Sequence, residues 1–113
     1  MIEKTIYDYL TEAASVPVYM TRPADLSGVT SYIMVEKTGS SRANYIETAT
    51  LAVQSYAPTI YEAAVLNEEV KKLMLDAISL DEISSSKLVS DYNFTNTQTK
   101  QPRYQAVFDV TYY

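Results

Sequence analysis

The sequence predicts an α+β fold: a small, mostly antiparallel sheet with two main helices packed on one face. Two segments carry apolar residues at the spacing of three and four that marks an amphipathic helix. Several others alternate apolar and polar residues, as half-buried strands do. Helices on one face of such a sheet bury both kinds of apolar surface together. With 113 residues, two glycines and four prolines, residues 1–113 are expected to form a single domain without an internal linker.

The first segment is expected to be helical. Its apolar residues recur at helical spacing at Ile2, Ile6, Tyr9 or Leu10, and Ala13. Pro17 cannot continue a helix, so the helix should end by residue 15 or 16. A short strand at 18–20 and a loop at 22–25 are expected to follow.

A hairpin is expected next. Residues 31–37 form a compact apolar run rich in strand-forming residues. The polar stretch from Thr38 to Asn44 contains Gly39 and paired serines, which is typical of a hairpin loop. Residues 45–56 then alternate with a period of two, which predicts a strand with one buried face.

The second helix is predicted to open at Pro58, where the missing N–H costs nothing. It continues with a single apolar stripe made of Ala63, Leu66, Val70, Leu73 and Ala77. Glu68 precedes Lys71 and Lys72 by three and four residues, a pattern typical of a solvated helix face.

The last third predicts a second hairpin. Its strands are residues 88–94 and 103–113, and residues 95–102 form a polar turn. The second of these strands has the clearest alternation in the chain, with Tyr104, Ala106, Phe108, Val110 and Tyr112 on one face.

The composition excludes several kinds of chemistry. The chain has no histidine and no cysteine, which removes zinc sites, disulfides and the most frequent general base. Two glycines cannot build a glycine-rich phosphate loop. The net charge is −5 and the longest basic run is Lys71-Lys72, so tight nucleic-acid binding is not expected. No stretch approaches a membrane span, and nothing at the start resembles a signal peptide.

Two short motifs resemble parts of penicillin-binding enzymes. Residues 84–87 fit the S-x-x-K pattern and residues 37–39 fit K-T-G. Their order along the chain is reversed and the S-D-N element is missing, so we interpret both as loop and strand-edge residues. We therefore expect no enzyme activity, no catalytic or metal-binding residue and no cofactor.

Three stretches resemble the tail terminator, or tail-completion, proteins of long-tailed bacteriophages. Residues 43–56 (ANYIETATLAVQSY) resemble the central strand of that family, and the helix from Tyr61 onward follows in the same place. Residues 91–95 (DYNFT) and 103–109 (RYQAVFD) resemble its closing hairpin. The resemblance extends from about Tyr32 to the C-terminus, and more loosely over the first helix.

The resemblance implies a structural role in the virion. Such proteins cap the tail tube, stop its polymerisation and offer a surface to the head connector or head-closure protein. They typically act as a six-fold ring through which DNA passes. The implied partners are therefore other copies of this chain, the major tail tube protein and the head connector, with synthesis in the cytoplasm of the bacterial host.

The two predicted hairpin loops are our candidates for contacts with neighbouring copies or the tube, because polar loops on a rigid sheet supply such surfaces. The candidate residues are Ser40, Ser41, Arg42, Asn44, Thr97, Lys100 and Arg103. For these residues, the alternative is that both loops are simply solvated. For the whole chain, the alternatives are another head–tail morphogenesis role (head closure or minor capsid) and a small cytosolic protein-binding module.

Overall fold

A computed structural model of the chain describes residues 2–21, 30–43, 46–95 and 101–112. It confirms the predicted α+β class, with a five-stranded mixed sheet and two main helices. The elements in chain order are α1 (Ile2–Ala13), β1 (Val18–Tyr19), β2 (Tyr32–Ala43), β3 (Ile46–Tyr56), α2 (Ile60–Asp76), the 3-10 turn η1 (Ala77–Ser79), β4 (Ile83–Asn93) and β5 (Arg103–Tyr112).

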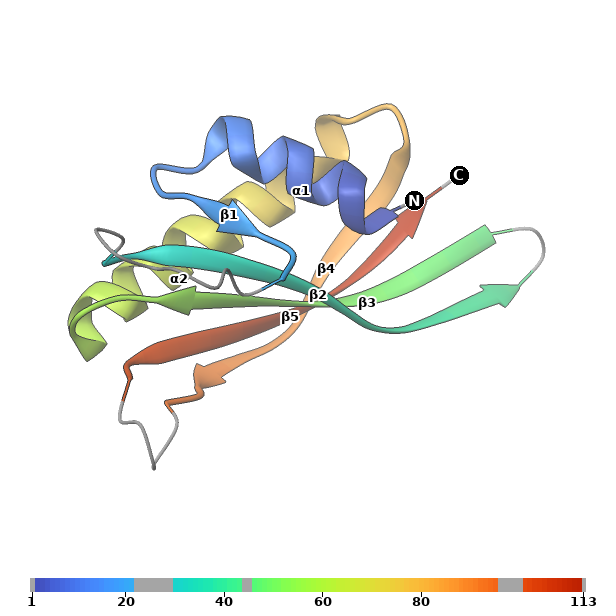
Figure 1. The fold of residues 1–113 in the computed structure, drawn as a ribbon. Coiled ribbons are helices and arrows are strands. Elements are labelled where there is room, and N and C mark those ends of the chain that lie inside the picture. Colours follow the sequence, from blue (N-terminus) through green and yellow to red (C-terminus); the bar gives the residue numbers. More distant parts are fainter. Residues whose placement is uncertain (1, 22–29, 44–45, 96–100, 113) are drawn as a thin grey trace.

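The strand order across the sheet is β1-β2-β3-β5-β4. The four long strands pair antiparallel, and only the two-residue β1 runs parallel to its neighbour β2. Both helices lie on the same face of the sheet, as Figure 1 shows. The opposite face carries no helix in the described part of the chain.

The core lies between the helices and the sheet. Alternate residues of β2, β3 and β5 point into it, as the period of two requires. The apolar stripes of α1 and α2 cover them, and the hydroxyl of Tyr9 on α1 donates to the carbonyl oxygen of Leu73 on α2 at 2.7 Å. The largest fully buried apolar side chains in this layer are Ile6, Leu10, Ile33, Leu51, Met74 and Phe108.

Helix α2 begins later than predicted. Its N-cap is Thr59, whose hydroxyl accepts a hydrogen bond from the N–H of Glu62 at 3.1 Å, and the first helical residue is Ile60. Threonine satisfies one of the free N–H groups of the first turn. The prediction that Pro58 opens the helix was therefore wrong, because Pro58 precedes the cap.

The apolar stripe of α2 is confirmed with one change. Ala63, Leu66, Val70 and Ala77 are buried, but Leu73 is only partly buried. The fully buried residue in that turn is its neighbour Met74. A helix turns 100° per residue, so the contact stripe on the sheet moved by one position near the end of the helix.

Two predicted loop segments are strands. β2 continues through Ala43, so the predicted loop from Thr38 was wrong for residues 38–43, while Asn44 lies outside the described residues. β4 begins at Ile83 rather than at residue 88. Residues 38–42 are exposed and follow a register shift between Lys37 and Gly39, whereas residues 83–87 bury Ile83 and Ser86 out of a period of two and contain a register shift between Ile83 and Ser85. Such irregularities remove the alternation by which strands are recognised.

The molecule is elongated, with extents of 43 × 25 × 24 Å. Figure 1 shows why: the hairpin of β2 and β3 extends beyond the ends of the helices. We call residues 39–43 and 46–50 of this hairpin the arm. The arm stays in register up to the pairs Arg42–Glu47 and Ala43–Ile46.

Candidate functional site

The arm carries three of the residues predicted to make intermolecular contacts. Ser40, Ser41 and Arg42 are exposed on β2. Ile46, at the start of β3, is 52% exposed. The arm therefore presents backbone and short polar side chains to solvent, with one large apolar side chain near its end.

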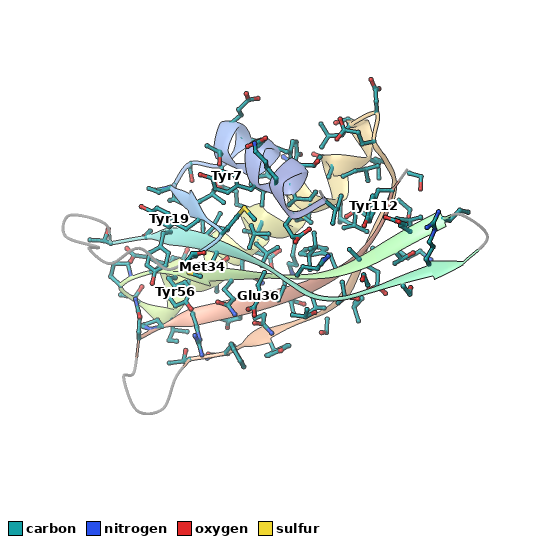
Figure 2. The ribbon with its side chains drawn as sticks, turned by 45° about the vertical axis from the view of Figure 1, so that its right-hand side comes forward. Tyr7, Tyr19, Met34, Glu36, Tyr56 and Tyr112 are labelled. Carbon is teal, nitrogen blue, oxygen red and sulfur yellow. The ribbon has the colours of Figure 1, made fainter. Side chains whose placement is uncertain are left out.

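The base of the arm carries charged groups from three elements, α1, β2 and β3. Lys37 lies 3.7 Å from the carboxylate of Glu3 on α1, and Arg42 lies 4.0 Å from that of Glu47. Lys37, Arg42 and Glu47 line a small hollow together with Ser40, Ser41 and Tyr112, the last of which is labelled in Figure 2. Burial first, and then the hydrogen bond to Glu47, raise the pKa of the Tyr112 hydroxyl above its usual value of 10.0. The contacts fix the arm relative to α1.

The sheet has two open edges in the described part of the chain. β4 is the last strand on one side. On the other side β1 pairs with β2 only at Ile33 and Met34, so the rest of β2 has a neighbour on one side alone. Unpaired N–H and C=O groups along an open edge are a template for adding another strand.

The face without helices carries a network of amides and aromatic rings. Nε2 of Gln54 donates to Oε1 of Gln105 at 2.8 Å, and Nε2 of Gln105 donates to the hydroxyl of Tyr92 at 2.6 Å. The hydroxyl of Tyr56 donates to Oε1 of Gln54 at 3.0 Å. Tyr56, labelled in Figure 2, stacks on Tyr32 with ring centroids 4.5 Å apart. Both tyrosines are almost fully buried.

Arg103 belongs to this network. Its Nη1 donates to the hydroxyl of Tyr56 at 2.9 Å, and its Nε donates to the carbonyl oxygen of Phe94. The guanidinium also lies 4.4 Å from the centroid of the Phe94 ring, a cation–π distance. Arg103 was predicted as an anchor for a neighbouring subunit, and its visible partners are within the chain. A contact with a neighbour stays a prediction.

The predicted contact residues do not form one site. Arg103 pairs with Tyr56 at one end of the long strands, whereas Arg42 pairs with Glu47, which pairs with Tyr112, at the other end. Arg103 and Tyr112 are nine residue steps apart on β5, which corresponds to about 30 Å of strand. Asn44, Thr97 and Lys100 lie outside the described residues.

The enzyme-like motifs are also kept apart. Ser84 and Lys87 lie on β4, and Lys37 lies on β2, with β3 and β5 between them. At about 4.8 Å per strand the two motifs are separated by roughly 14 Å. The hydroxyl of Ser84 donates to the carbonyl oxygen of Thr111. Among the described residues no group of three or more acidic side chains is placed to hold a metal ion.

Charge is distributed unevenly between the helix layer and the sheet layer, and the net charge of −5 does not reveal this. The helices and the segment 77–82 carry nine acidic and three basic side chains, a net charge of −6. The strands carry four acidic and four basic side chains, a net charge of zero. The helix layer is thus an acidic surface, and the sheet layer is neutral. The sequence alone did not predict this charge difference, because the difference depends on which elements lie in each layer.

Comparison with protein-family models and with curated proteins finds no match for this chain. No helix among the described residues is long and apolar enough to cross a membrane.

Proposed function

We propose that this protein is a phage tail terminator, or tail-completion protein, that assembles as a ring, most simply a hexamer. It would cap the tail tube, stop its polymerisation and offer the head-joining surface, with DNA passing through the ring. Two things support the proposal: the resemblance of residues 43–56, 91–95 and 103–109 to that family, and the two open edges of the sheet. The open edges of β2 and β4 are the structural observation on which the proposed self-assembly rests.

The direction of the strands favours head-to-tail association. The long strands β2, β3, β5 and β4 alternate in direction, so β2 and β4 run opposite ways. A second copy in the same orientation can then place its β2 antiparallel against β4 of the first. Such a contact joins two different surfaces, and a contact of this kind forms a ring when the rotation closes.

The two open edges also occupy the same position along the strand axis. Cross-strand partners connect Lys37 through Leu51 and Phe108 to Leu88. A second row connects Ser40 through Ala49 and Val110 to Ser86. The free part of β2 therefore lies level with the first half of β4. Copies can pair along these edges without a large shift along the strand axis, which is a requirement for closure.

The test uses one variant at each edge. Val89 on β4 and Thr38 on β2 are exposed and lie at two of the three register shifts, where each is skipped in the pairing with the neighbouring strand. Val89→Lys and Thr38→Lys place a charge at each edge, a device by which natural edges avoid pairing. Each variant alone should be monomeric by light scattering after size exclusion. A mixture of the two should form dimers and nothing larger, because one competent edge of each kind remains.

The wild-type protein should have a mass near six subunits, with rings visible by electron microscopy. Ile78→Lys in η1, at a site that is 57% exposed, is the control and should not change the mass. A wild-type protein that stays monomeric at all concentrations would contradict a self-assembled ring and favour a protein-binding module. A Thr38→Lys protein that still dimerises would indicate two-fold pairing of β4 with β4.

A further inference from the structure

A groove on the helix layer has a different character from the sheet edges. It lies where the chain leaves α1 and where α2 begins, and its volume is about 260 Å³. The residues lining it are Ser15, Val16, Ser31, Tyr61, Glu62, Val65, Leu66 and Glu69. Its lining is predominantly apolar, whereas the hollow beside Asp8 is about equally polar and apolar and the one at the base of the arm is more polar than apolar.

The apolar side chains of this groove are exposed to an unusual degree. Tyr61 is 77% exposed and Val65 is 52% exposed, and Ile60 beside them is 40% exposed. They follow one another within two turns of α2. Clustered exposed apolar side chains of this kind mark a binding surface more often than scattered ones do.

Two carboxylates flank the apolar centre. Glu62 and Glu69 are seven residues apart, two turns of α2, so both lie on the side that carries Val65. Oε2 of Glu69 accepts the N–H of Ser15 at 3.1 Å, and the hydroxyl of Ser15 also donates to this carboxylate. That carboxylate is held in place before any ligand arrives.

No basic side chain lines the groove among the residues that the structure describes. On α2, Lys71 contacts Glu68 at 2.8 Å and Asp91 at 3.1 Å, and Lys72, three residues after Glu69, is exposed and forms no ion pair among the described residues. The groove also belongs to the layer with a net charge of −6. The carboxylates are therefore left to attract a positive group.

We propose that this groove binds a segment of a partner protein in which basic residues flank one or two large apolar residues. The apolar residues would contact Val65 and Tyr61, and the basic residues would pair with Glu62 and Glu69. Complementary charge of this kind selects the partner and raises the rate of association. The proposal does not depend on ring formation, because the groove and the sheet edges are different surfaces.

The experiment selects binders from a displayed library of random 12-residue peptides on the full-length protein, with counter-selection on Val65→Asp. The selected peptides should be enriched in lysine or arginine next to leucine, isoleucine or an aromatic residue. The best peptide is then labelled with fluorescein, and its affinity is measured by anisotropy.

Two pairs of variants separate the groove from the general acidity of the layer. Glu62→Lys and Asp81→Lys change the net charge equally, but Asp81 is an exposed turn residue outside the groove. Val65→Asp and Ile78→Asp place a charge at similarly exposed apolar sites, 52% and 57%. We expect Glu62→Lys and Val65→Asp each to weaken the peptide at least about tenfold, as hot-spot residues do. Asp81→Lys and Ile78→Asp should leave the affinity within about twofold.

Several results would overturn the proposal. Selected peptides without basic enrichment, or no selected peptide at all, would remove the assigned partner chemistry. An equal loss for Asp81→Lys and Glu62→Lys would reduce the effect to non-specific attraction. A wild-type oligomer that Val65→Asp converts to monomer, as measured by light scattering, would show that a second copy fills the groove.

Discussion

At the scale of the single residue, the packing of α2 depends on one side chain more than on its neighbour. Met74 is fully buried, whereas Leu73 is only partly buried. Met74→Ala should lower the free energy of unfolding by about 2–5 kcal/mol, because it removes buried methylene groups and leaves a cavity. Leu73→Ala should cost less, although leucine is the more typical core residue. Urea denaturation of both variants checks this, and a larger loss for Leu73→Ala would contradict the burial.

Arg103 allows a second residue-scale prediction. Its planar guanidinium reaches the Tyr56 hydroxyl, the Phe94 carbonyl and the Phe94 ring together. Arg103→Lys keeps the charge but cannot make the same forked contacts. We expect it to lower the free energy of unfolding by about 1 kcal/mol. Thermal unfolding of Arg103→Lys beside Lys87→Arg, an exposed site on β4, is the measurement; equal stabilities would show that the charge alone matters.

At the scale of the element, the strands that sequence reasoning placed well are those with one buried face. β5 was predicted to begin at residue 103, where it does begin, because Ala106, Phe108 and Val110 alternate with more exposed residues. Residues 38–43 of β2 and residues 83–87 of β4 were missed as strand. Residues 38–42 are exposed, and the buried residues of the β4 segment, Ile83 and Ser86, do not alternate with a period of two, so only pairing with β3 and β5 identifies these segments as strands.

The contact between α1 and α2 gives the element-scale prediction. The hydroxyl of Tyr9 donates to the carbonyl oxygen of Leu73, and burial, followed by the nearby charge of Asp76, raises the pKa of Tyr9 above 10.0. Folding therefore favours the protonated hydroxyl. Its stabilising contribution is complete below pH 10 and is lost as the pH rises through the raised value.

Replacing Tyr9 with phenylalanine removes this titration together with the hydrogen bond. Tyr9→Phe should be slightly less stable than the wild type at pH 8, and its unfolding temperature should fall less steeply between pH 9.5 and 11. Circular dichroism across this pH range measures both effects. Tyr7→Phe on the same helix is the matched control, and parallel curves for Tyr9→Phe and the wild type would disprove the assignment.

At the scale of the whole molecule, the sequence predicted the class of fold, the number of main helices and their common face. It could not predict the open edges, because edge position depends on the order of strands, and β5 lies between β3 and β4. Nor could it predict the groove, since Ser15 and Glu69 are 54 positions apart. Of the predicted contact residues, those on the arm are exposed as expected, and Arg103 is engaged within the chain.

The uneven layering of charge makes the two proposed associations respond differently to ionic strength. Salt screens attraction between exposed charges, with a Debye length of about 10 Å at 0.1 M and about 3 Å at 1 M. Strand pairing along a neutral layer is carried by backbone hydrogen bonds and should persist as salt rises. Binding of a basic segment to an acidic groove should weaken steadily. Raising the salt concentration should therefore dissociate the bound partner from the groove while the ring stays assembled. Ionic strength would then regulate partner binding separately from ring formation.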